Sequence, residues 1–242
     1  NAFTALLPII ITGAFCTLFS NVVCSTTTTG ISLAKLPGMA WLENFTEMFT
    51  AANYATLNFL TIGTVILIAI ELGKQLGHKE IAVPVVALSA YVTLCNTFTN
   101  VEVEGVSDLV NVVNVLPREF TNAQGLFLGM ITAIVSIEIY CRMSNSGKLR
   151  INMPDSVPTN VSQSFNVLFP GVLTILAISG FGLLFKTVVG LTVYDAISAG
   201  IQTPLRGVLT GLPGYLLIFG LSCVFWVIGI HGNQIIKPVR EP

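Results

Sequence analysis

Long stretches without a single charged side chain dominate this sequence and restrict its fold more than any other feature. Six such runs are long enough to cross a bilayer, for which a helix needs roughly 20 apolar residues. They cover residues 3–24, 48–70, 81–101, 120–137, 156–185 and 207–230.

The composition leads to the same conclusion. Charged residues make up only 10% of the chain, and the mean hydropathy is +0.81. An ordinary soluble domain is roughly 25% charged, so this chain has too few charges to cover a surface in water. The sequence therefore predicts an all-α, polytopic membrane helix bundle with about six transmembrane helices.

Lysine and arginine are divided unevenly between the two sets of connections. Seven lie in the gaps after the second, fourth and sixth runs, and four lie in the opposite gaps. Basic residues favour cytoplasmic loops, so we expect the first set of gaps, and the start of the first run, to face the cytoplasm. The net charge of −1 indicates no strong attraction to nucleic acid.

The segment 187–206 is neither a span nor an ordinary loop. Val193, Ile197 and Ile201 recur at four-residue spacing, while Asp195 and Gln202 lie off this stripe. This pattern predicts a short amphipathic helix lying along the membrane interface.

Two carboxylates next to apolar runs have a basic neighbour at helical spacing. Glu71 precedes Lys74 by three residues, and Glu138 precedes Arg142 by four. Each pair is interpreted either as an ion pair that ends a span or as a group with a role in substrate binding or ion coupling. His78 lies in a short basic gap and is predicted to be a solvated loop residue.

His231 differs from His78 because it follows an apolar run and lies between Gly229 and Gly232, with Asn233 and Gln234 after it. Glycines let backbone and ligand approach closely, and imidazole both donates and accepts hydrogen bonds. A satisfied helix-cap histidine and a ligand site are both compatible with this pattern. Phosphate-loop, nucleophile-elbow and metal-ligand motifs are absent from the sequence, so we expect no metal and no cofactor.

The run Phe225-Trp226-Val227-Ile228-Gly229-Ile230-His231-Gly232 resembles the FWxxGIHG signature of the bacterial phosphotransferase membrane component, EIIC. The segment from Met153-Pro154 to Pro170 is similar to the MPxxVPxxVxxSFxxLxP pattern of its lactose, cellobiose and diacetylchitobiose branch. Residues 2–8 and 124–138 resemble the first and fourth spans of that branch. The likeness extends over nearly the whole chain, which resembles the first half of such a component.

The resemblance implies a multi-pass homodimer in the bacterial cytoplasmic membrane, surrounded by membrane lipids. Residues 1–186 would hold the dimer contact, 187–206 the interfacial helix, and 207–242 the start of the sugar-binding transport part. The substrate would be a disaccharide such as cellobiose, diacetylchitobiose or a lactose-like sugar, phosphorylated by a phosphorylated EIIB subunit. The chain would thus take part in a transport-coupled phosphotransfer whose phosphate donor is a separate subunit.

The family resemblance also assigns roles to single residues. His231 would bind the sugar and assist phosphate transfer, and Gly229, Gly232 and Asn233 would line the substrate site. The family carries a further sugar-binding carboxylate in a second half, which this sequence does not contain, so only part of the site is expected here. Two other functions stay open: an ion-coupled secondary sugar transporter using Glu71 and Glu138, and a membrane scaffold without transport activity.

Overall fold

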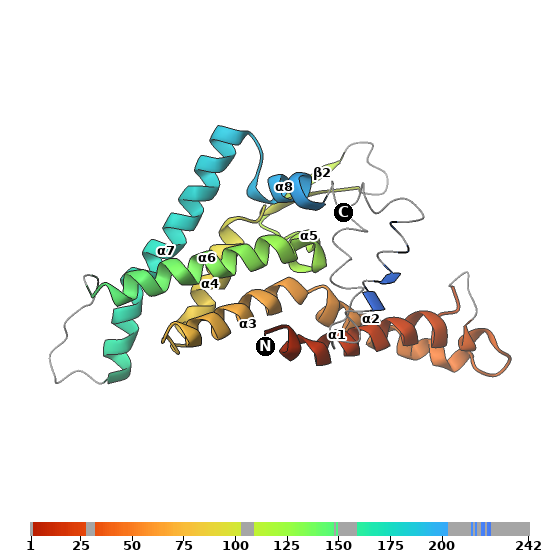
Figure 1. Ribbon diagram of the computed structural model, residues 1–242. Coiled ribbons are helices and arrows are strands. Elements are labelled where there is room, and N and C mark those ends of the chain that lie inside the picture. Colours follow the sequence, from red (N-terminus) through yellow and green to blue (C-terminus); the bar gives the residue numbers. More distant parts are fainter. Residues whose placement is uncertain are drawn as a thin grey trace.

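A computed structural model describes residues 2–27, 32–102, 109–147, 149 and 159–202, together with 214, 216, 219–220 and 222–223. Within these residues the chain is mainly helical (Figure 1). The long helices are α1 (Ala2–Leu18), α2 (Thr46–Leu57), α3 (Leu60–Gln75), α4 (Ala82–Thr93), α6 (Leu126–Asn145) and α7 (Thr159–Val189). Shorter elements are α5 (Arg118–Thr121), α8 (Val193–Ile197), 3-10 turns at Leu33–Lys35, Ala40–Phe45 and Ala123–Gly125, and π turns at Phe19–Val23 and Ser198–Gln202.

The predicted spans can be compared with these helices one by one. Three described segments are long and apolar enough to cross a membrane, Thr4–Val23, Ala123–Asn145 and Phe165–Val189, and they match the first, fourth and fifth predicted spans. The second predicted span corresponds to a helix pair, Ala40–Leu57 and Leu60–Gln75, bent by 40°. Most of the sixth, 207–230, lies outside the described residues.

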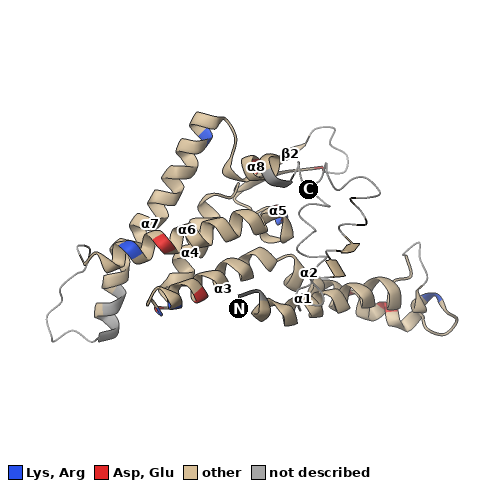
Figure 2. Ribbon diagram, in the orientation of Figure 1, with Lys and Arg blue, Asp and Glu red and all other residues tan. Residues whose placement is uncertain are grey.

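The outer surface of the bundle is apolar. On α7 the side chains of Leu176, Leu183 and Val188 are 61%, 70% and 76% exposed. Figure 2 shows that the coloured charged positions lie mostly near the ends of the helices, with long uncharged stretches between them. Soluble monomers rarely expose apolar surface on this scale, so the helix bundle is suited to lipid, and the predicted membrane fold is confirmed.

The centre of the bundle lies where α3, α4 and α6 pack against one another, with α7 against α4 and α6. Val65 and Ala69 of α3, Ala87 of α4, and Ala133 and Ile137 of α6 are all fully buried there. Small residues permit this close approach, as is typical of helices packed in membranes. Gly129 illustrates the point, because a Cβ atom at this position would lie 2.7 Å from Thr61 Cγ2.

Several polar groups inside the bundle hydrogen-bond to residues of neighbouring elements, which lowers the cost of placing them in an apolar solvent. The Tyr91 hydroxyl donates to the Phe120 carbonyl oxygen at 2.5 Å, and the Thr61 hydroxyl donates to the Asn122 carbonyl oxygen. At the break between α2 and α3, Arg118 Nε donates to the buried Asn58 Oδ1 at 2.5 Å. The start of α6 is thereby fastened to both α3 and α4.

The third predicted span, 81–101, is wrong at its C-terminal end. Helix α4 ends at Thr93, and Phe98–Val101 form strand β1, which pairs antiparallel with β2 (Val110–Val113). The register places Phe98 opposite Val113 and Val101 opposite Val110. Polar and β-branched residues follow Cys95 in the sequence, and such residues favour a strand over continuation of the helix.

The amphipathic segment predicted at 187–206 contains α8 and the π turn at Ser198–Gln202, while residues 203–206 lie outside the described residues. Helix α7 continues to Val189 and ends at Gly190, whose φ of +78° favours glycine. After it, α8 packs Val193, Tyr194 and Ile197 against the central core, and the Tyr194 ring lies 4.8 Å from that of Phe120. These side chains therefore pack partly against protein, and the position of the helix at the membrane interface stays a prediction.

Candidate functional site

The residues that the sequence identified as the substrate site, Gly229, His231, Gly232 and Asn233, lie outside the described residues. Their roles therefore stay predictions. The described part of the chain instead shows a polar site at the end of the bundle where α3 is followed by α4 and where α6 ends. The sequence placed this end on the cytoplasmic side.

The position of His78 follows from the way α3 ends. The Gly77 N–H donates to the Lys74 carbonyl oxygen at 3.2 Å, and the His78 N–H donates to the Gly73 carbonyl oxygen at 2.8 Å. Together with a φ of +87° at Gly77, these bonds form a Schellman motif, which turns the chain back across the helix end. His78 is the residue after the left-handed glycine, so it is directed toward the bundle.

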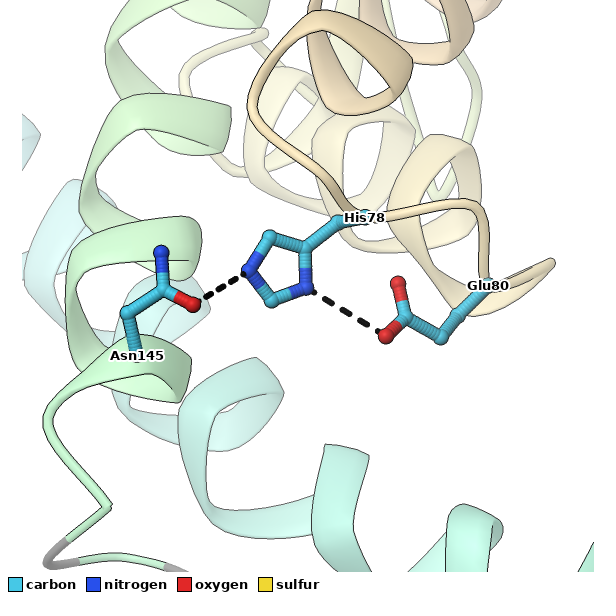
Figure 3. A network of polar contacts seen from close by, with 3 residues as sticks. All are labelled: His78, Glu80 and Asn145. Atoms are coloured by element: carbon cyan, nitrogen blue, oxygen red, sulfur yellow. Dashed lines mark hydrogen bonds and ion pairs between the residues drawn. The ribbon is translucent and has the colours of Figure 1, made fainter.

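His78 joins the loop after α3 to the end of α6 (Figure 3). Its Nε2 lies 3.0 Å from Asn145 Oδ1 at the end of α6, and its Nδ1 lies 3.3 Å from Glu80 Oε1. The ring also packs edge-on against Tyr140, with centroids 5.8 Å apart. His78 is only 8% exposed. The prediction of a solvated loop residue is therefore wrong, because the Schellman turn buries this side chain against α6.

The two ring nitrogens of His78 face oxygen atoms of different segments. Nδ1 faces the Glu80 carboxylate in the loop after α3, and Nε2 faces the Asn145 amide oxygen at the end of α6. The imidazole N–H can donate to either oxygen, so the ring bridges the loop and α6.

A polar pocket of about 790 Å³ opens beside this network. Its walls come from the loop after α3, the end of α6 and the first half of α7. The lining residues are Gly77, His78, Lys79, Glu80, Ser144, Asn145, Gly147, Leu149, Asn166, Val167 and Pro170. Next to it, Glu80 Oε2 and Tyr140 Oη are buried and have no hydrogen-bond partner among the described residues, which is an environment that suits ordered water.

Of the two predicted ion pairs, that on α6 is present. Arg142 Nη2 lies 2.8 Å from Glu138 Oε1, at the predicted spacing of four residues. The side chains of Arg142 and Glu138 are 79% and 41% exposed, so the pair contributes little to stability. Its observed geometry supports the structural interpretation of Glu138. The pairing predicted between Glu71 and Lys74 stays a prediction.

A second group of acidic and aromatic residues lies at the opposite end of the bundle, around α5 and α8. Burial raises the pKa of Glu119, and the Asp195 carboxyl raises it further. Burial, followed by the charges of Glu119 and Asp195, also raises the pKa of Tyr194 to about 12. Across the described ranges, no three His, Cys, Asp or Glu side chains gather in a way that could hold a metal ion.

The sequence contains a signal for the His78 site. A glycine just after a helix, followed by a polar residue, is the pattern of a Schellman turn, and Gly77-His78 follows Gln75-Leu76 at the end of a clear apolar helix. The partner Asn145 could not be found in this way, because it lies 67 residues further along the chain.

Comparison with known proteins gives a consistent result. The family model described as "Phosphotransferase system, EIIC" matches residues 1–242. The oligo-beta-mannoside-specific EIIC component of Bacillus subtilis (strain 168) is 28% identical over 243 residues, covering 100% of this chain and 52% of the relative. The cellobiose-specific EIIC component of Geobacillus stearothermophilus is 24% identical over 210 residues, covering 87% of this chain and 46% of the relative.

A solved structure agrees with these relatives. The crystal structure of the transporter ChbC, the IIC component from the N,N'-diacetylchitobiose-specific phosphotransferase system, superposes with a TM-score of 0.73 at 27% identity. The match covers 100% of this chain and 54% of that one. The chain thus spans about half the length of the relatives that it matches.

Proposed function

We propose that this chain, which belongs to the phosphotransferase system EIIC family, forms part of a sugar permease. The permease would serve a phosphoenolpyruvate-dependent phosphotransferase system. The observation that carries this proposal is the family match over residues 1–242. The helical membrane fold and the similarity to the diacetylchitobiose transporter support it.

The substrate class is proposed from the names of the relatives. Their sugars are an oligo-beta-mannoside, cellobiose and N,N'-diacetylchitobiose, which are all β-linked. The proposed substrate is accordingly a β-linked disaccharide. The compound that leaves the transporter on the cytoplasmic side is its phosphate ester, whose added charge of nearly −2 prevents return across the hydrocarbon core.

Within this proposal His231 holds the sugar and assists phosphate transfer to one of its hydroxyl groups. Gly229 and Gly232 let the sugar approach the backbone, and the Asn233 amide hydrogen-bonds to a hydroxyl. The phosphate comes from a phosphorylated EIIB subunit, so the protein chiefly has to align the sugar hydroxyl with that donor. The family match and the sequence motif support these roles.

The proposed organisation divides the chain into three parts. Residues 1–186 form the dimerisation part of a homodimer, 187–206 connect it to the rest, and 207–242 begin the sugar-binding part. The protein lies in the bacterial cytoplasmic membrane, with the connections after α3 and α6 on the cytoplasmic side. The lysine and arginine distribution supports this orientation.

An ion-coupled transporter is the less favoured function. It requires carboxylates that bind a coupling ion, and one of its two candidates, Glu138, is paired with Arg142 at 2.8 Å. No other described contact supports a coupling role for it.

The site proposal is tested with His231→Ala in the full-length protein, with the α7 surface variant Leu183→Ala as a matched control. We expect His231→Ala to abolish phosphorylation of a labelled β-linked disaccharide while membrane insertion is unchanged, and Leu183→Ala to retain both. Unchanged phosphorylation in His231→Ala would remove His231 from the site.

A further inference from the structure

We propose that the groove between the end of α3 and the start of α4 binds the headgroup of an anionic phospholipid in the cytoplasmic leaflet. The groove has a volume of about 240 Å³. Its lining combines an apolar wall with a charged rim. The lining residues are Ile70, Lys74, His78, Lys79, Glu80, Ile81, Val83 and Pro84.

The apolar wall continues onto the outer face of α4. Ile81 is 88% exposed, and Val85, one helical turn further, is 58% exposed on the same side. Residues four apart on a helix lie one above the other, so these two side chains form a strip that runs from the groove toward the middle of the bundle. Such a strip is suited to an acyl chain.

The rim supplies positive charge at the end of that strip. Lys74 and Lys79 are both exposed, and both line the groove. Long lysine side chains reach from the edge of the hydrocarbon to the headgroup layer. The ammonium groups therefore lie at the level where lipid phosphates are found.

The one acidic residue in the groove does not cancel this charge. Glu80 directs Oε1 toward His78 Nδ1 at 3.3 Å, and it is the one carboxylate among the described residues that line the groove, against two lysines. Nearby on α6, Glu138 and Arg142 neutralise each other. The two lysines outnumber the one carboxylate, so the lining is net positive, which complements an anionic headgroup.

The same features favour a lipid over a free anion as the occupant. A free phosphate would contact the lysines but would leave Ile81 and Val85 uncovered, whereas a phospholipid satisfies both the rim and the strip. Anionic lipids are attracted to basic groups on the cytoplasmic side of membrane proteins, by about 1 kcal/mol for each lysine or arginine, which corresponds to about fivefold in affinity.

The test uses full-length protein reconstituted in vesicles that contain either phosphatidylglycerol or phosphatidylcholine with a photoactivatable group in the acyl chain. After illumination, labelled peptides are mapped by mass spectrometry. We expect phosphatidylglycerol to label the peptide containing Ile81 and Val85 more strongly than phosphatidylcholine. The double variant Lys74→Gln/Lys79→Gln should lose this preference and bind phosphatidylglycerol about 25-fold less tightly, at about fivefold per lysine.

The control variant Lys35→Gln/Lys186→Gln removes the same charge at positions outside the groove and should retain wild-type labelling. Three outcomes would overturn the proposal. They are equal labelling by the two lipids, unchanged labelling in Lys74→Gln/Lys79→Gln, and displacement of the lipid by millimolar inorganic phosphate, which would identify a simple anion site.

Discussion

His78 Nε2 and Asn145 Oδ1 lie 3.0 Å apart although the two residues are separated by 67 positions in the sequence. This contact fastens the loop after α3 to the end of α6. Both segments were placed on the cytoplasmic side from their basic residues, and their direct contact agrees with a common side. The same ring also faces Glu80 in its own loop, so one buried histidine links this loop to α6.

Removing either partner of this contact should destabilise the protein. His78→Ala removes the contacts of a buried ring with Asn145 and Glu80. Because Asn145 is exposed and Glu80 is partly exposed, water can replace the lost partner, so each hydrogen bond is worth only about 0.5–1.5 kcal/mol. We expect His78→Ala and Asn145→Ala each to lower the unfolding free energy, and the double variant to cost less than the sum. Thermal unfolding of the full-length protein in detergent measures this coupling, and strict additivity would show that the two side chains do not interact.

The turn that positions His78 depends on glycine at position 77. Its φ of +87° is unfavourable for a residue with a Cβ atom, by roughly 1–2 kcal/mol. We expect Gly77→Ala to be destabilising by about this amount. Gly180→Ala is the matched control, because Gly180 lies inside α7, where a Cβ would meet nothing within 4 Å. That variant should be neutral or slightly stabilising, and an equal loss in both would contradict the Schellman assignment.

Gly129 is expected to be required for the contact between α3 and α6. A Cβ atom there would lie 2.7 Å from Thr61 Cγ2 and 3.0 Å from Val65 Cγ2, and overpacking of this kind typically costs about 1–3 kcal/mol. Thr61→Ser removes the methyl group but keeps the hydroxyl that bonds to Asn122. Unfolding measurements should therefore show that Thr61→Ser relieves part of the loss caused by Gly129→Ala. Absence of any relief would place the clash elsewhere.

The sequence was informative where one physical requirement dominates. Uncharged runs long enough to span a bilayer located the first, fourth and fifth spans, and helical spacing identified the pair of Glu138 and Arg142. It was less informative where two tendencies compete. The apolar run at 81–101 does not distinguish a helix from a strand by length alone, and the Val- and Asn-rich segment that pairs with its end was not recognised as a strand.

Contacts between distant segments could not be read from the sequence. The amphipathic pattern of α8 identified its apolar side chains but not what covers them, because protein and membrane both satisfy such a stripe. His78 was assigned to solvent because charged and polar neighbours surround it in the sequence. Its burial depends on where α6 ends, which is a property of the tertiary fold.

The packing of α5 against α8 should depend on pH through Glu119. Burial and the Asp195 charge raise the pKa of this carboxyl in the folded protein above its ordinary value. The folded state thus binds a proton more readily than the unfolded chain, so stability is greatest below the ordinary carboxyl range and falls as the pH rises through the raised pKa. Glu119→Gln should remove this dependence.

The measurement is the difference in melting temperature between wild type and Glu119→Gln from pH 4 to pH 7. We expect Glu119→Gln to gain relative to wild type as the pH rises. Asp195→Asn, which removes the neighbouring charge, should show a smaller gain than Glu119→Gln. A difference that does not change with pH would contradict the electrostatic account.

The central claim, that the chain belongs to a permease coupling sugar entry to phosphorylation, is tested most directly by the chemical form of the sugar after transport. Vesicles carrying the full-length protein would be supplied with a radiolabelled β-linked disaccharide, with or without phosphorylated EIIB on the cytoplasmic side. We predict that sugar phosphate appears only with phosphorylated EIIB and persists when sodium and proton gradients are collapsed. Accumulation of unmodified sugar that disappears with those gradients would contradict the account.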